Sequence, residues 1–527
     1  MFKKLLLYNF GSQLFARVIS FIINLNFYRI IDGDLLGLIN VQLTLLYNTT
    51  LFLSREPVRR TVLANNGKFE ELITTMWISF GFSVIFGGIL SIVWMVTLMN
   101  ISSIYEDRYL FMIFMFLLSI IVEGFSEPFA MSCMKLGESE RFLIAQGVLV
   151  FLQKVSSAFM IFILKFDHVN SLCWGQLIGS IGYLLYFIYF WYNNSLLYKN
   201  SKKITLKSLF QINIKLFWYS DNKKMLLSYL FHSLIKQIIT DTSGYVMTFT
   251  NSLSLKEQAI YDAIEKIGSL AVRIILKPLE EAAQIFYNSK ASDKKKENEN
   301  EDNIFMNFKT SLKGIGIIGL VIGIFSSSYS EIVVRILLGE NLLKYANGAL
   351  LLSAYAKVLV IMAINGLTEC LAMSLMNEIQ ISKHGIFLFG LGIFNIIVSI
   401  VLSKNIGSIG FTISNGVHML IRIFYNCLFI DKVKHQKFRP LSDYFIQKKT
   451  TIVLIFSIVL TQVSYYIFEE MAVDKNLTIF GIVNLSLYDL IHIIIGLLVL
   501  IMTSLLILKL EYPHLKISSS LLNRKLD

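Results

Sequence analysis

Residues Leu51–Arg60, LFLSREPVRR, begin as an apolar run and end as a cluster of charge around Pro57. A second stretch of the same design, Ile274–Glu281, reads IILKPLEE and has Pro278 at the equivalent place. The recurrence predicts an internal parallel repeat of the kind that transporters use, although chance similarity between amphipathic helices is the alternative. A proline at each place is expected to kink or terminate its helix near a cytosolic gate.

Both stretches belong to a chain of 527 residues that is rich in apolar runs. Hydrophobic residues make up 55% of it and charged residues 16%, below the roughly 25% of soluble domains. Runs of about twenty apolar residues, long enough to cross a bilayer as a helix, recur throughout. We therefore predict an all-α polytopic membrane protein, and such continuous runs exclude a barrel built from strands of about ten alternating residues.

The apolar runs predict about fourteen transmembrane spans. They centre on residues 5–30, 35–54, 72–98, 109–132, 142–164, 171–197, 225–250, 258–286, 306–330, 345–376, 382–402, 406–430, 450–469 and 485–508. With the N-terminus in the cytosol, the connections rich in Lys and Arg all fall on the cytosolic side. The even count then places both termini in the cytosol.

A charged linker near the middle of the chain suggests two helical lobes. The predicted parts are an N-lobe, a cytosolic basic loop, a C-lobe with a charged cytosolic loop, two last spans and a cytosolic tail. In the same order, their bounds are 1–198, 199–224, 225–431 (with the charged loop at 288–305), 449–510 and 511–527.

The net charge of +12 raises the question of nucleic acid, but the basic residues gather in loops between apolar runs. Orientation in the membrane explains them, so no nucleic-acid partner is expected. The sequence holds no Walker loop and no GxSxG, HExxH or CxxC motif, and its four cysteines lack metal or disulfide spacing. We expect a transporter without metal or cofactor. A membrane-embedded glycosyltransferase is disfavoured because the non-cytosolic loops are short.

Polar residues recur at every third or fourth position in the first, second and eighth spans, which places each set on one helix face. Some of these charges have partners within helical reach, such as Lys266 with Asp262, and could simply lock the helices. As a set they favour a water-filled central cavity, because charge inside lipid is costly. Basic residues without an obvious partner would make this cavity positive and suited to an anionic ligand. They are Arg17, Arg29, Arg55, Lys236, Arg273 and Arg422.

Five stretches along the chain carry a family resemblance. They read GLINVQLTLLYNTTLFLSREPVRR, GYVMTF, AIYDAIEKIGSLAVRIILKPLEE, AINGLTECLAMSLM and GSIGFTISNGVHMLIRI. Together they resemble the eukaryotic Rft-type oligosaccharide translocation proteins of the multidrug/oligosaccharidyl-lipid/polysaccharide flippase superfamily. The resemblance implies two pseudo-symmetric six-helix lobes around a central cavity, with two extra C-terminal helices.

The resemblance also implies a function in protein N-glycosylation at the endoplasmic reticulum. The substrate would be dolichol pyrophosphate carrying five mannoses and two N-acetylglucosamines, moved from the cytosolic to the luminal leaflet among the lipids of that membrane. The C-terminal Arg524–Asp527 looks like a dibasic retrieval signal for this compartment. Two alternatives stay open: a non-transporting assembly factor, with enzymes of the pathway as partners, and an exporter of drugs or cations.

The candidate site residues fall into two groups. The six basic residues named above are assigned to substrate binding, in which arginines bind the pyrophosphate while the lobes rock between two openings. The other group is assigned to the gate or to structure. It comprises Glu56, Pro57, Arg59, Arg60, Asp262, Lys277, Pro278, Glu280, Glu281, Asn365 and Glu369. Among both groups, the residues at family motif positions are Arg29, Arg55, Glu56, Arg59, Arg60, Asp262, Arg273, Pro278, Glu280, Asn365, Glu369 and Arg422, and the family adds Tyr245 and Gly268.

Overall fold

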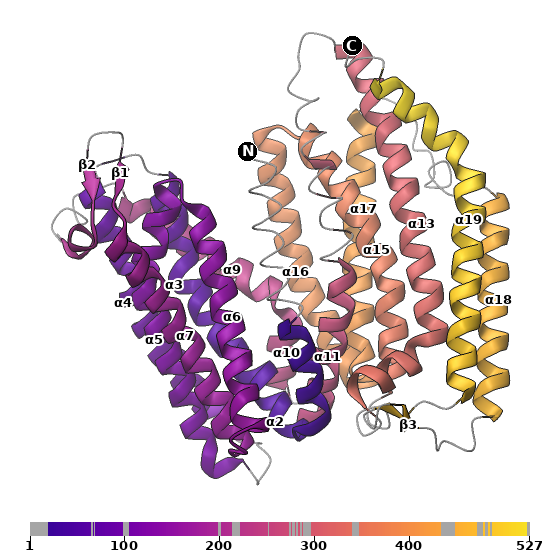
Figure 1. Cartoon of the computed structure of the whole chain (residues 1–527). Helices are drawn as coiled ribbons and strands as arrows, with labels where there is room; N and C mark the ends of the chain where they lie inside the picture. Colours follow the sequence, from indigo (N-terminus) through magenta and orange to yellow (C-terminus); the bar gives the residue numbers. More distant parts are fainter. Residues whose placement is uncertain are drawn as a thin grey trace. The chain divides into compact units, whose positions relative to one another are not determined.

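The computed structural model of the chain forms two compact units, Met1–Ala259 and Ile260–Asp527, each a bundle of helices (Figure 1). The residues that it describes are 19–64, 67, 69–97, 105–198, 202–212, 222–250, 252–272, 276, 280, 283–284, 287, 297–339, 347–433, 448–471, 478–479, 483–484 and 487–523.

The first unit is built around five long helices. They are α3 (Thr44–Ala64), α4 (Phe69–Thr97), α5 (Glu106–Lys135), α6 (Ser139–Phe162) and α7 (His168–Asn193). Residues 19–30 are helical as well, and are followed by α2 (Gly33–Gly37) and the π-helix η1 (Leu38–Leu43). Past α7 lie β1 (Leu196–Tyr198), β2 (Lys202–Ile204), the 3₁₀-helix η2 (Leu206–Phe210), α9 (Asn222–Thr240) and α10 (Thr242–Thr250). Helix α11 (Leu255–Ala271) begins in this unit.

Helix α3 lies at the centre of this unit, where it packs against α4, α5 and α9. It continues past Pro57 to Ala64, so the predicted termination at this proline does not occur. Val58 and Val62 are fully buried after the proline and pack against α4 and α5, which holds the helical turn in place. In a membrane bundle, packing of this kind lets a helix accommodate proline.

The basic loop after α7 is folded onto the first unit. Strands β1 and β2 pair antiparallel, with Leu196 opposite Ile204. Ile204 and Leu209 are buried in the aromatic core of α4, α5 and α7, and Trp77 of α4 donates a hydrogen bond to the Leu209 carbonyl at 2.7 Å. Residues 213–221 of the predicted loop lie outside the described part of the chain.

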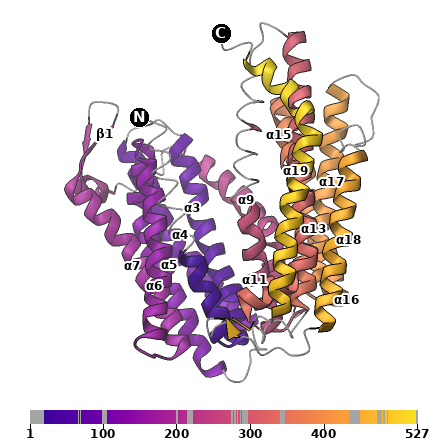
Figure 2. The same ribbon diagram turned by 45° about the vertical axis from the view of Figure 1, so that its right-hand side comes forward.

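The second unit contains six further long helices, which run side by side in both views (Figure 2). They are α13 (Glu297–Leu338), α15 (Gly348–Leu375), α16 (Glu378–Ile406), α17 (Ile409–Val433), α18 (Lys448–Met471) and α19 (Leu487–Asn523). A short pair of strands, β3 (Thr478–Ile479) and β4 (Val483–Asn484), lies between the last two. The turn from α15 to α16 is closed by a capping box, in which Asn377 and Gln380 each bind the other's backbone N–H at 2.9 Å.

The last two helices are attached to α13 by a buried polar network. Arg335 of α13 binds Asp489 of α19 at 3.0 Å and Glu331, one turn away, at 2.7 Å. Tyr465 of α18 donates to Glu331 at 2.8 Å, and the ring of Tyr329 on α13 stacks on His492 of α19 at 4.2 Å. These bonds join all three helices, so α18 and α19 are an integral part of the second unit.

Eleven helices within the described residues are long and apolar enough to cross a membrane. Their outer faces carry exposed aliphatic side chains, as on α19, where Ile494, Leu497, Leu498, Ile501 and Leu505 are all more than half exposed. Such faces suit a lipid surround. The prediction of an all-α polytopic membrane protein is confirmed.

The predicted count of fourteen spans, like the predicted lobe bounds, stays a prediction. The eleven helices match eleven of the expected spans. The expected span 225–250 consists of two shorter helices, α9 and α10, and the spans 5–30 and 258–286 lie partly outside the described residues.

Two predicted loop regions contain helix. Residues 297–305, expected within a charged loop, form the first turns of α13. Helix α19 likewise extends to Asn523 into the expected tail, and Arg524–Asp527 lie outside the described residues.

Candidate functional site

The most deeply buried charges of the first unit lie between α3 and α5. Arg55 and Arg59 are four residues apart on α3, and Glu123 and Glu127 are four residues apart on α5, so each pair occupies one face of its helix. The Arg55 guanidinium binds Glu123 at 2.8 Å and Glu127 at 3.0 Å, and Arg59 binds the other Glu127 oxygen. We call these four residues the α3–α5 charge cluster.

The α3–α5 charge cluster is almost completely removed from solvent. Glu123 and Glu127 are 1% and 0% exposed, and Arg55 is 8% exposed. The hydroxyl groups of Tyr47 and Ser180 also donate to Glu123, the latter at 2.9 Å. Buried charges persist only when they are paired and hydrogen-bonded, and here two arginines compensate two glutamates.

A second set of charges lies on the neighbouring face of α3, toward α9. Glu56 binds Arg60 at 2.8 Å, one helical turn away, and lies 3.8 Å from the Lys236 ammonium of α9. Arg60 also lies 3.4 Å from His232. We call Glu56, Arg60 and Lys236 the α3–α9 charge cluster; with one carboxylate for two cations, it carries an excess positive charge.

Arg29 differs from these residues in having no counter-charge within the described part of the chain, where its buried Nε atom also lacks a hydrogen-bond partner. The helix that carries it ends at Ile30, and Asp32, two residues further on, accepts a hydrogen bond from Tyr105 at 3.1 Å. Burial and the Asp32 carboxylate raise the pKa of Tyr105 to about 12, so this hydroxyl remains a donor at neutral pH. The bond fixes the end of the helix next to Arg29.

In the second unit, Arg422 of α17 pairs with Glu369 of α15. Asn365 lies one turn before Glu369 and donates to the same carboxylate at 3.5 Å, a long contact. On α11, Lys266 binds Asp262 at 2.6 Å, the local pair that the sequence suggested. These contacts bring Asn365, Glu369 and Arg422 together and leave Asp262 in a separate pair.

Two glycines at family motif or neighbouring positions permit close packing in the second unit. A Cβ atom at Gly366 would lie 1.7 Å from a Glu280 carboxylate oxygen, and one at Gly268 would lie 2.2 Å from the Tyr355 ring. Glycine therefore lets Glu280 approach the α15 backbone. The remaining predicted site residues lie outside the described residues; they are Arg17, Arg273, Lys277, Pro278 and Glu281.

Glu123 and Glu127, which bind Arg55 and Arg59, were not singled out from the sequence. A signal was available, because two carboxylates four residues apart in an otherwise apolar run need partners inside the bundle. Tyr245, a family motif position, donates to or accepts from Thr49 of α3 at 2.7 Å and so joins α10 to α3.

Long apolar helices with ion pairs enclosed between them define a polytopic membrane protein. The fold is similar to the solved structure "Lipid II flippase MurJ, inward closed conformation", with a TM-score of 0.63 and 14% identity over 95% of this chain and 99% of that one. The likeness shows that the two proteins share a fold.

The chain belongs to the Rft protein family, whose model matches residues 3–519. The "Man(5)GlcNAc(2)-PP-dolichol translocation protein RFT1" of Caenorhabditis elegans is 34% identical over 516 residues, 95% of this chain and 94% of that protein. The protein of the same name from Mus musculus is 28% identical over 484 residues, 86% of each chain. The family resemblance inferred from the sequence is confirmed.

Proposed function

We propose that this protein moves the dolichol-pyrophosphate-linked oligosaccharide Man5GlcNAc2 from the cytosolic to the luminal leaflet of the endoplasmic reticulum membrane, for protein N-glycosylation. The observation that carries the proposal is the family match from residue 3 to residue 519. The Caenorhabditis elegans relative named for this translocation aligns over 94% of its length, so the similarity is not confined to one segment of that protein.

The substrate has three chemically distinct parts, and each needs a different environment. Its pyrophosphate requires cations, its glycan requires polar or wet surroundings, and its isoprenoid chain suits lipid. In our proposal, the first two parts enter a positively charged central cavity, which opens to one side of the membrane and then to the other. Both termini would lie in the cytosol.

We assign the first contacts with the pyrophosphate to the basic residues that are least compensated. Arg29 has no counter-charge among the described residues, and the α3–α9 charge cluster holds Lys236 and Arg60 against Glu56 alone. Lys236, which is 46% exposed, can reach a ligand without leaving a buried partner. Arg17 and Arg273 complete the proposed set.

Arg55 and Arg422 would bind the pyrophosphate by exchange, because each is already paired with carboxylates. Removing one partner from a buried pair costs about 3–5 kcal/mol, so a phosphate oxygen must take the place of the carboxylate that leaves. Guanidinium groups suit such an exchange, since carboxylate and phosphate offer them the same two-oxygen geometry. We propose that this exchange couples substrate binding to the packing of α3 on α5.

The test is transport of the authentic glycolipid by the purified protein in sealed vesicles. The glycolipid is placed in one leaflet, and its arrival in the other is followed with a membrane-impermeant glycosidase or lectin. Transport that depends on the protein supports the proposal. Its absence, together with co-purification of enzymes of the pathway, would instead favour an assembly factor.

A further inference from the structure

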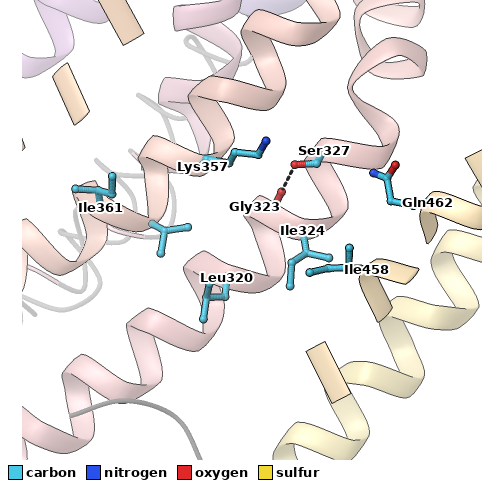
Figure 3. Close-up of a pocket in the computed structure, with 9 residues that line it drawn as sticks. Leu320, Gly323, Ile324, Ser327, Lys357, Ile361, Ile458 and Gln462 are labelled. Carbon is cyan, nitrogen blue, oxygen red and sulfur yellow. Dashed lines mark hydrogen bonds between the residues drawn. The ribbon is translucent and has the colours of Figure 1, made fainter. Parts of the chain in front are cut away.

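A cavity of about 510 Å³ opens between α13, α15 and α18 in the second unit, and its lining shares no residue with the charge clusters described above (Figure 3). Its volume lies within the range of about 300–1,000 Å³ that ligand pockets occupy. Most of its lining is aliphatic, including Leu320, Ile324, Ile361 and Ile458. We call it the α13–α15–α18 pocket.

The polar groups of this pocket gather at one end. Lys357 points toward Ser327 and Gln462 (Figure 3). The apolar residues lie earlier on the helices that carry these two polar residues: Leu320 and Ile324 on α13, and Ile458 on α18. This arrangement follows from the chain direction, because Ser327 is one turn after Gly323 on α13 and Gln462 one turn after Ile458 on α18. At the other end of the pocket, Leu320 and Ile324 pack against a small buried apolar cluster of Ile317, Leu454 and Ile507.

Among the described residues that line the pocket, Lys357 alone carries a charge. Its side chain is exposed, and within the described part of the chain no carboxylate lies within ion-pair distance of it. The two polar neighbours already have partners: Ser327 donates to the Gly323 carbonyl and Gln462 donates to Ser328, both at 2.9 Å. The pocket therefore offers a ligand one cation and a long apolar wall.

The depth of Lys357 fits a charge at a lipid head group. Helix α15 has 28 residues and is about 42 Å long, about 12 Å more than the hydrocarbon core of a bilayer. Lys357 lies about 13 Å from the first residue of α15, hence about 7 Å inside that core when the helix is centred. Its Cβ points toward the N-terminus of the helix, so the side chain can extend to the nearby interface.

We propose that the α13–α15–α18 pocket binds one bilayer phospholipid with a singly charged anionic head group. One acyl chain fills the apolar end, and the phosphate meets the Lys357 ammonium. One ammonium complements one phosphodiester charge. A pyrophosphate-linked glycan would need several cations and a polar lining, which this pocket does not offer, so the site is separate from the proposed transport path. The lipid would fill the space between α18 and the α13–α15 pair.

The test uses the full-length protein in phosphatidylcholine vesicles that contain a phosphatidylinositol with a diazirine on its acyl chain. After illumination, labelled peptides are identified by mass spectrometry. The same diazirine on phosphatidylcholine and on a polyprenyl phosphate provides the comparison. We expect phosphatidylinositol to label residues 320–327 and 458–462 more than phosphatidylcholine does.

Four variants separate the proposal from non-specific labelling. Lys357→Gln is expected to lower the preference for phosphatidylinositol about five-fold. One lysine near the membrane surface contributes about 1 kcal/mol to the binding of an anionic lipid, which corresponds to that factor. Lys357→Arg should retain the preference, and Lys404→Gln, which removes an exposed lysine of α16, should leave it unchanged. Ile458→Trp, which fills the pocket, should abolish labelling. If this variant does not fold, the comparison of Lys357→Gln with Lys357→Arg still tests the proposal.

Equal labelling by the two phospholipids, or labelling that Lys357→Gln leaves unchanged, would overturn the proposal. Labelling of the pocket by the polyprenyl phosphate that excess phosphatidylinositol cannot displace would also overturn it, and would assign the pocket to the isoprenoid chain of the carrier.

Discussion

Replacing Arg55 by methionine is expected to destabilise the first unit strongly. The substitution keeps an apolar stem of similar length but removes the cation that lies between Glu123 and Glu127. Glu127 retains Arg59, whereas Glu123 keeps only hydroxyl donors, at 1% exposure. Removing one partner of a buried pair costs about 3–5 kcal/mol. Because Glu123 keeps its hydroxyl donors, we expect the free energy of unfolding to fall by about 3 kcal/mol, at the lower end of this range.

A double-mutant cycle shows whether this cost arises from the pair itself. Glu123→Gln in the Arg55→Met background removes the unpaired charge, so most of the lost stability should return, with a coupling energy of about 2 kcal/mol. The matched control is Arg108→Met. Arg108 and its partner Asp167 are 52% and 47% exposed, and exposed pairs contribute at most about 1 kcal/mol.

The measurement is equilibrium unfolding of the purified variants in mixed micelles with increasing dodecyl sulfate, followed by the loss of helical circular dichroism. The free energies of unfolding of the four members of the cycle give the coupling energy. The effects of independent substitutions add to within about 0.5 kcal/mol. A coupling energy below that value would therefore refute the argument that these charges depend on each other. So would a loss for Arg108→Met as large as that for Arg55→Met.

Three further substitutions have distinct expected outcomes. Arg29→Gln should lower glycolipid transport in vesicles several-fold, with stability changed by at most about 0.5 kcal/mol, because no described residue depends on its charge. Gly37→Val should destabilise by about 1–3 kcal/mol, since a Cβ there would lie 2.0 Å from the Leu255 carbonyl oxygen, whereas Gly88→Val, with nothing within 4 Å, should not. Arg422→Gln should weaken transport and also stability in the unfolding assay, because its carboxylate partner on α15 loses its counter-charge; unchanged stability would contradict this pairing.

The helical spans could be predicted from the sequence because a bilayer dictates their length and apolar character. Local ion pairs were also accessible: Lys266 with Asp262 follows from four-residue spacing on one helix. Partners on different helices were not. Which carboxylate meets Arg55 depends on the rotation and register of α5 against α3, and neither is encoded in local spacing.

Whether Pro57 ends its helix could not be predicted for a related reason. Local geometry alone favours a break at proline, but packing on both sides of it carries α3 onward to Ala64. The network that joins Arg335 to Asp489 was likewise beyond the sequence, because 154 residues separate the two partners along the chain. Each of these features depends on packing between residues that lie far apart in the sequence.

The distribution of charge bears on which residues can act in transport. In the α3–α5 charge cluster, and where Arg335 of α13 binds Asp489 of α19, cations and carboxylates compensate each other at close range. These groups therefore hold helices together. Their net field on a ligand is correspondingly small, because opposite charges a few ångströms apart act at a distance as dipoles. Under the proposed function, the attractive field for the pyrophosphate comes from surplus cations, which among the described residues of the first unit include Arg29 and the excess charge beside Glu56. Substitutions of surplus cations should therefore alter transport before stability, and substitutions of compensated cations should alter stability first.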